Sequence, residues 1–317
     1  MEGQIKLQTL RGPLLESFCL GRAVVSTASG HALYNVGKMG DSIPILACGH
    51  PLQLAAILSQ NPSILPSDES YLALAMGNCQ ASPEQLEGLK DMASRFGFSE
   101  EDLQCGRMGF RHSCAGFHSI LLAMAKNMSL KPKSYRDPQG KVCCTLLDAQ
   151  LRFLRKLRTE VTIVMDDCGL PSLGLTLLEI ASSYAAFADP SAVSVEHRRA
   201  LAKLVAALRT APECFAPKDT LEGAILEASE GKLLLRFAEN GLATATSFDR
   251  GWGIALKSED GSPRSCEIML LRLLVEMGLV PNGRAESLLE LRLRVRNPRG
   301  DYCGERRIRA ELKSARS

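Results

Sequence analysis

The stretch KLLLRFAENGLATATSFDRGWGIALKS, residues 232–258, contains three short runs that are rich in apolar residues and threonine. Runs of this length, interrupted by polar residues and glycine, are typical of β-strands. We therefore predict strands over 232–237, 242–247 and 252–257. These strands place a sheet in the last third of the chain.

The two ends of the chain carry further strand-like segments. Apolar runs at 23–27 and 32–36 flank a Ser-Gly pair, which is the pattern of a β-hairpin. A second pair of strands is predicted around 289–296 and 304–312, joined by a turn over the sequence Asn-Pro-Arg-Gly. Strands are thus expected at both ends of the chain.

The middle of the chain has the residue spacing of helices. Ser82-Pro83-Glu84-Gln85 has the form of a capping box, with the serine as N-cap and the proline in the first turn. Pro51 opens another apolar stretch in the same way. Strands at both ends around a helical middle predict an α+β sandwich whose N- and C-terminal strands share one sheet. Apolar spacing predicts helices up to Gly97 and over 117–127, 171–188, 195–209 and 264–278.

Composition narrows the class of protein. With 45% hydrophobic and 23% charged residues, the 317-residue chain is expected to be globular, and no apolar run approaches the 18 or so residues that span a bilayer. The net charge of +3 favours neither nucleic acid nor membrane as a partner. The segment 281–317 is basic, with ten Lys or Arg against five Asp or Glu, which is typical of a solvated surface hairpin.

Cysteine usage predicts a reducing, cytoplasmic environment. The chain has eleven cysteines, an odd number, and its first residues lack the apolar core of a secretion signal. No two cysteines have the C-x-x-C spacing of a zinc ribbon or a thioredoxin motif.

Several segments together resemble the asparaginase II family of the thermolabile type. They occur in the family's order along nearly the whole chain. The resemblance implies a serine β-lactamase-like fold over 1–317, with a sheet portion (1–45 and 230–317) and a mainly helical portion (46–229). It also implies a homodimer. The most specific segments are DDCGLPS at 166–172 and GIALKSEDG at 253–261, and HPLQ at 50–53, LQCG at 103–106 and NPRGDYCGERR at 297–307 accompany them.

The departures from the family pattern fall on its catalytic residues. The resemblance implies a Ser-x-x-Lys sequence at a helix start, where residues i and i+3 share one face. The serine is the nucleophile and the lysine helps to remove its proton. The corresponding segment here is Ala47-Cys48-Gly49-His50, so Ala47 takes the serine position and His50 the lysine position. Alanine cannot be a nucleophile, so we expect that efficient asparagine hydrolysis by this mechanism is lost.

Other catalytic positions of the family are also changed. A second family serine aligns with Asn78, which can donate a hydrogen bond but cannot relay a proton as a hydroxyl does. A family lysine aligns with Arg236, whose guanidinium stays protonated and is a poor base. A family glutamate aligns with Asn240, although Glu239 is adjacent. Cys48 has the chemistry of a nucleophile, but it lies only two residues from His50, on a different helix face.

The family's metal site is partly retained. Its two cysteines persist as Cys114 and Cys168, whereas its lysine is replaced by Phe117. Cys114 and His118 are four residues apart, so in a helix they share a face and could bind zinc together with Cys168 and Asp166. The alternative is a pair of buried thiols under an apolar cap.

The sequence therefore leaves two functions open. The first is a hydrolase that acts on a different amide or ester with rebuilt chemistry, and the second is a pseudoenzyme that binds a small ligand or a protein partner. Fold alone does not decide between them. The candidate catalytic residues are Cys48, His50, Asn78 and Arg236, the candidate substrate-binding residues are Asp166, His118 and Lys257, and the candidate zinc ligands are Cys114 and Cys168.

Overall fold

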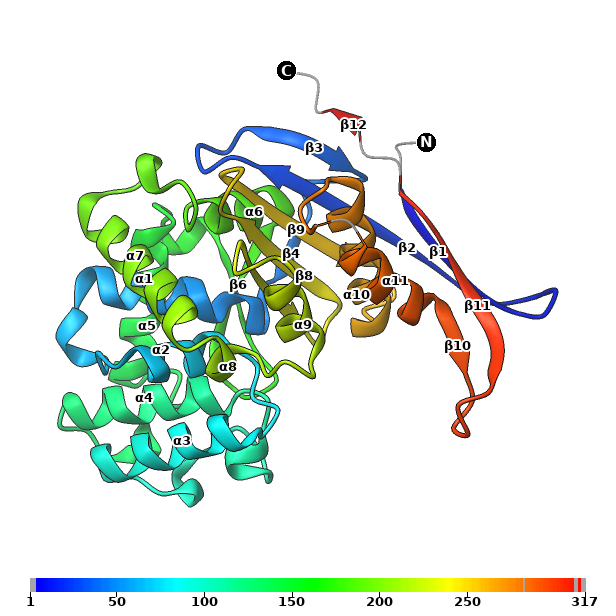
Figure 1. The fold of residues 1–317 in the computed structure, drawn as a ribbon. Coiled ribbons are helices and arrows are strands. Elements are labelled where there is room, and N and C mark those ends of the chain that lie inside the picture. Colours follow the sequence, from blue (N-terminus) through cyan, green and yellow to red (C-terminus); the bar gives the residue numbers. More distant parts are fainter. Residues whose placement is uncertain (1–3, 282, 311–312, 315–317) are drawn as a thin grey trace. The chain divides into compact units, whose positions relative to one another are not determined.

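The computed structural model describes residues 4–281, 283–310 and 313–314 (Figure 1). The chain forms two compact units and passes between them several times. The division falls within β4 (Ser42–Pro44) and α9 (Leu221–Ala228), among other places. Unit 1 consists of residues 1–43, 176–189 and 225–317, and unit 2 of residues 44–175 and 190–224.

Unit 1 is built around one antiparallel sheet. Across the described residues the strands follow the order β10-β11-β1-β2-β9-β8-β7, with β3 beside β2 and β12 beside β3 (Figure 1). The prediction that N- and C-terminal strands share one sheet is therefore confirmed. The strands are β1 (Ile5–Arg11), β2 (Leu14–Ser26), β3 (Ala32–Val36), β7 (Leu233–Ala238), β8 (Leu242–Ser247), β9 (Trp252–Ser258), β10 (Arg294–Arg296), β11 (Tyr302–Arg309) and β12 (Lys313–Ser314).

The centre of this sheet is the core of unit 1. Every residue of β7 and β8 is buried, as expected for strands that are covered on both faces. Helix α6 (Leu177–Ala185) lies directly on β9, because a Cβ atom at Gly253 would be only 1.8 Å from the carbonyl oxygen of Ala181. Only glycine permits this approach. Helix α10 (Pro263–Glu276) contributes a further apolar face to the same core.

Unit 2 is mainly helical and carries a short antiparallel hairpin of β5 (Thr162–Met165) and β6 (Pro171–Thr176). Ser82 caps α3 as predicted, since its hydroxyl accepts a hydrogen bond from the backbone N–H of Gln85, but the predicted capping box is wrong in its other half, because Oε1 of Gln85 accepts the N–H of Gln80. None of the helices in the part of the chain that the structure describes could span a bilayer. The helices of unit 2 are α1 (His50–Gln60), α2 (Glu69–Met76), α3 (Pro83–Phe96), α4 (Ala115–Asn127), α5 (Lys141–Phe153), α7 (Val195–Thr210) and α8 (Pro212–Phe215).

Close packing of α4 on α2 fixes the helix that carries Phe117 and His118. A Cβ atom at Gly116 would lie 2.1 Å from the carbonyl oxygen of Leu74, so the two backbones touch at this point. Residues 115–125 of α4 are all buried. The side chains that follow Gly116 therefore have little freedom of position.

Two predicted elements are wrong in type. The predicted helix over 171–188 begins only at Leu177, because Pro171–Thr176 pairs with β5 and Thr176 then forms a capping box with Glu179. The predicted strand over 289–296 is mostly the helix α11 (Arg284–Leu293), and only Arg294–Arg296 is a strand. Its partner prediction, 304–312, is confirmed up to Arg309, and residues 311–312 lie outside the described residues. The mixed α+β class itself is confirmed.

Candidate active site and metal cluster

The segment that corresponds to the family's nucleophile forms a helix start. Residues Leu46–Gly49 make one 3₁₀ turn, and α1 follows from His50 with Pro51 in its first turn. Leu46 has a φ of 44°, in the left-handed region that residues other than glycine rarely adopt. Its N–H donates to the hydroxyl of Ser172 over 3.0 Å. Such strained backbone is concentrated at functional sites, and it precedes Ala47 here.

His50 is closed in by an aromatic ring. Its imidazole stacks on the ring of Phe117, with 4.0 Å between ring centroids and 4° between the planes. His50 is 2% exposed and Phe117 is 1% exposed. Cys48 is completely buried. The Phe117 ring thus covers one face of the buried His50 imidazole.

His118 is a buried imidazole that contacts the hydroxyl of Tyr135. The backbone N–H of Gln104 donates to the Tyr135 hydroxyl over 2.8 Å, and this hydroxyl lies 2.7 Å from Nδ1 of His118. A tyrosine hydroxyl can donate to an imidazole nitrogen or accept from it, so this contact satisfies Nδ1 in either neutral tautomer. Burial lowers the pKa of His118 to about 3. His118 is therefore uncharged at neutral pH.

Two thiols and an imidazole come together at the N-terminus of α4. One ligand atom from each of His112, Cys114 and Cys168 lies within 4.8 Å of the others. Cys114 is the N-cap residue of α4, and its backbone N–H donates to Nδ1 of His112 over 3.1 Å. A hydrogen bond with Cys114, together with burial, raises the pKa of the Cys168 thiol. We call these three residues the thiol–imidazole cluster.

A tight turn presents Cys168 to this cluster. The Asp166 carboxylate accepts the backbone N–H groups of Cys168 and Leu170, over 2.9 and 2.8 Å. Arg136 donates to the carbonyl oxygens of Cys168 and Gln104. Burial raises the pKa of the Asp166 carboxyl. Asp166 thus has a structural role in this turn, and its expected contact with substrate stays a prediction.

Two further thiols lie near the cluster but are not part of it. The Cys79 thiol donates to the carbonyl oxygen of Phe110 over 3.2 Å. Burial raises the pKa of Cys79, and it raises that of Cys105 to about 12. Both thiols are therefore protonated at neutral pH, which suits a packing role.

The predicted site residues are divided between the two units. Cys48, His50, Asn78, Asp166 and His118 belong to unit 2, together with Cys114 and Cys168. Arg236 and Lys257 belong to unit 1. Arg236 is a buried residue of β7, and Lys257 of β9 donates from Nζ to the carbonyl oxygen of Ser258 over 2.6 Å.

The donor set of the thiol–imidazole cluster fits zinc. Structural and catalytic zinc sites use cysteine sulfur and histidine nitrogen in tetrahedral geometry, and three protein ligands leave the fourth position open. The set differs from the predicted one in its histidine. His112 joins the two cysteines, whereas Nδ1 of His118 is bound to Tyr135. Helix spacing does not point to His112, because this residue precedes α4. The signal in the sequence is the position of His112 only two residues before Cys114.

The chain was compared with protein families, curated proteins and solved structures. The family L-asparaginase II matches residues 7–308. The search of curated proteins found no match. Among solved structures, a β-lactamase from Mycobacterium bovis aligns with a TM-score of 0.46 and 13% identity, covering 81% of this chain and 94% of that chain.

Proposed function

Since the chain belongs to the L-asparaginase II family, we propose that it is a divergent member without efficient asparaginase activity and that its unit 2 binds a zinc ion. One observation carries the first part of this proposal. The position of the family's nucleophile is Ala47, and the position of its lysine is His50, which is buried and stacked on Phe117. Neither residue can perform the family's proton transfer from a serine.

The magnitude of the expected loss is large. In subtilisin, loss of the nucleophile alone costs about 2 × 10⁶ in kcat. The buried thiols do not replace it here. Cys48 is completely buried, and the Cys79 thiol is protonated and bonded to a carbonyl oxygen. Activated cysteine nucleophiles instead have lowered pKa values and partial exposure.

The zinc part of the proposal is supported by the thiol–imidazole cluster. His112, Cys114 and Cys168 would be the protein ligands, and a bound zinc ion would supply a Lewis acid with one open position. Cysteine ligates zinc as a thiolate, so each thiol proton of this pair would be released when the metal binds. Arg136 and Asp166 would keep Cys168 in place by holding its backbone.

A second candidate function is a hydrolase for a different amide or ester. The observation that favours it is the left-handed backbone of Leu46, which retains strain beside the position of the lost nucleophile. The partly exposed Cys114, with His112 beside it, is the pair of nucleophile and base types that such an enzyme would need.

One set of measurements tests both candidates. Ammonia release from millimolar L-asparagine is followed with added zinc and, separately, with chelator, and metal content is measured on the same purified protein. We expect about one zinc ion per chain and no ammonia above the rate of a Cys114→Ser, Cys168→Ser double variant. Clear ammonia release by the wild-type protein alone would overturn the loss of activity. Hydrolysis of a chromogenic ester that disappears in Cys114→Ser would favour the second candidate.

A further inference from the structure

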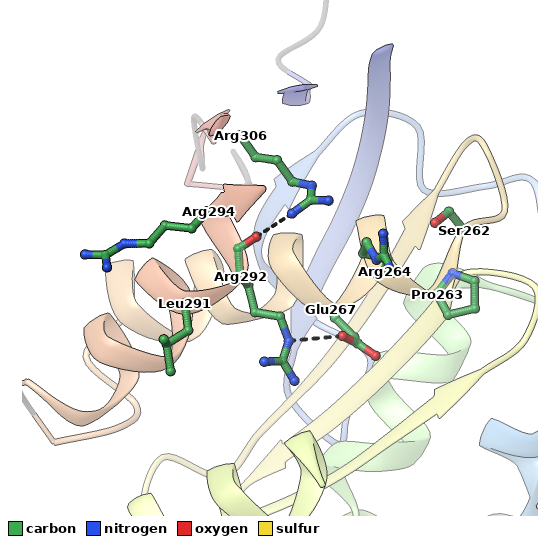
Figure 2. A pocket seen from close by; sticks show the side chains of 8 residues that line it. All are labelled: Ser262, Pro263, Arg264, Glu267, Leu291, Arg292, Arg294 and Arg306. Atoms are coloured by element: carbon green, nitrogen blue, oxygen red, sulfur yellow. Dashed lines mark hydrogen bonds and ion pairs between the residues drawn. The ribbon is translucent and has the colours of Figure 1, made fainter. Parts of the chain in front are cut away.

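An arginine-rich pocket lies in unit 1, on the C-terminal part of the sheet. It has a volume of about 670 Å³ and is open to solvent. Helix α10, helix α11 and strands β10 and β11 supply its walls (Figure 2). We call it the arginine pocket. Its lining residues are Ser262, Pro263, Arg264, Glu267, Leu291, Arg292, Arg294 and Arg306.

The lining is unbalanced in charge. It contains four arginines and a single carboxylate, Glu267. Glu267 already accepts a hydrogen bond from Nε of Arg292 over 3.3 Å. Figure 2 shows this ion pair and the bond from Arg306 to the backbone carbonyl of Arg292, which is 2.8 Å long. The lining thus contains three more arginines than carboxylates.

Arg264 and Arg306 carry most of this excess positive charge. Burial and the nearby charge of Arg264 lower the pKa of Arg306, so the two guanidinium groups repel each other. Arg264 forms neither a hydrogen bond nor an ion pair with any described residue. Glu16 also lies near Arg306, but Arg11 holds its carboxylate at 3.0 and 3.1 Å. An anion between Arg264 and Arg306 would remove the repulsion.

The start of α10, Arg294 and the lack of aromatic side chains in the lining limit how the pocket could recognise a ligand. At the N-terminus of α10 the Ser262 hydroxyl accepts the N–H of Ser265, and the Asp260 carboxylate accepts the N–H of Ser262 and the hydroxyl of Ser265. Arg294 extends away from Arg264 in Figure 2 and pairs weakly with Glu290 at 3.9 Å. The lining contains no aromatic side chain that could stack on a base. Recognition must therefore come from the guanidinium groups.

We propose that the arginine pocket binds a diphosphate group of a small molecule. Planar guanidinium groups bind phosphate oxygens in a two-pronged way, and several of them suit an anion of high charge. A volume of about 670 Å³ is within the range of small-molecule sites, roughly 300–1,000 Å³. The proposal concerns unit 1 and does not rest on zinc binding or on hydrolysis.

Calorimetric titration of the full-length protein with inorganic pyrophosphate tests the proposal. The protein is first treated with chelator and dialysed, because pyrophosphate itself binds zinc. Pyrophosphate should bind saturably, and Arg264→Ala should weaken binding about tenfold or more, as expected for loss of a charge-assisted bond. Arg264→Lys retains the positive charge but lacks the planar guanidinium group. Its affinity for pyrophosphate should lie between those of the wild type and of Arg264→Ala.

Arg299→Ala is the matched control, since it removes the same charge from the turn between β10 and β11, outside the pocket. It should change binding less than twofold, and thermal melting should show that all variants are folded. Equal weakening by Arg264→Ala and Arg299→Ala, or the absence of binding at millimolar pyrophosphate, would overturn the proposal.

Further titrants identify the source of the diphosphate. Binding of ADP as tightly as pyrophosphate would indicate a nucleotide, and much weaker binding of ADP would indicate free pyrophosphate. Tighter binding of citrate than of pyrophosphate would overturn the preference for phosphate. So would binding of a single-stranded oligonucleotide that Arg299→Ala weakens as much as Arg264→Ala, because that pattern indicates a dispersed basic surface.

Discussion

The starts of helices α1 and α4, both in unit 2, differ in the side chains that surround them. At the start of α1, where the resemblance predicts that the family's serine and lysine are replaced, His50 is covered by Phe117. At the start of α4, Cys114 keeps Cys168 as a neighbour, and His112 is beside them. A helix start is thus retained as a structural element whether or not its chemistry survives. The surrounding side chains determine which chemistry a helix start can still support.

Phe117 connects the two helix starts, because it belongs to α4 and its ring contacts His50 at the start of α1. It lies three residues after Cys114, at the position where the resemblance implies a metal-binding lysine. Its ring packs against His50 instead of facing the thiols with a nitrogen. If the predicted correspondence holds, this one residue takes the place of a metal ligand and also fills the space beside His50. The cluster then depends on His112 for its third ligand.

The largest expected effect comes from Phe117→Ala. Truncating a completely buried phenylalanine leaves a cavity and lowers the free energy of unfolding by about 3–5 kcal/mol. Zinc affinity should be unchanged, because Phe117 offers no ligand atom. Chemical denaturation and zinc titration of the same variant measure the two quantities. Phe18→Ala, the same change at a half-exposed site, should cost far less. If Phe117→Ala also loses zinc affinity, the packing around His50 and the thiol–imidazole cluster are not independent.

The second-largest expected effect is a loss of zinc affinity in Cys168→Ser. Cys168→Ser should lower zinc affinity at least about 100-fold, the upper end of what loss of an outer-shell partner costs, because a direct ligand is removed. Competition with a chromophoric chelator measures the affinity. Cys144→Ser changes an exposed thiol outside the cluster and should have no effect. If the two variants bind zinc equally, Cys168 is not a ligand.

A smaller effect is expected from Tyr135→Phe. Loss of this hydroxyl leaves the N–H of Gln104 and the Nδ1 atom of His118 without their partner in a buried place. An unsatisfied buried polar group costs about 1–3 kcal/mol. The free energy of unfolding should fall by this amount, while zinc affinity stays within a few-fold. A stability equal to that of the wild type would show that water replaces the hydroxyl.

The effect that is smallest at neutral pH, and that grows as the pH falls, is a pH dependence that arises from His118. Its pKa is about 3 in the folded chain, against about 6.5 when unfolded. Between these values only the unfolded state binds the proton, so this histidine lowers the free energy of unfolding as the pH falls from 6.5 towards 3. His118→Asn should flatten that part of the pH profile. His31→Asn, at an exposed histidine, should leave the slope unchanged. A slope unchanged in His118→Asn would show that other groups cause it.

Much of the fold could be predicted from local sequence patterns. The strands at 232–257, the hairpin that ends at Val36 and the helix capped by Ser82 follow from apolar runs, turn residues and a capping serine. The failures share one cause. Pro171–Thr176 and Arg284–Leu293 have apolar spacing that suits either a strand or a helix, so their surroundings decide: the first segment pairs with β5, and the second packs as a helix against α10 and β11.

The sequence by itself determined what chemistry is missing. An alanine at position 47 and a phenylalanine at position 117 cannot be a nucleophile or a ligand in any fold. Only the tertiary structure decided which groups meet. It brought His112 rather than His118 to the thiols, placed Phe117 on His50, and gathered Arg264 and Arg306 around one pocket. Residue identity fixes the chemistry that a side chain can perform, whereas distances between residues far apart in the chain depend on how helices and strands pack.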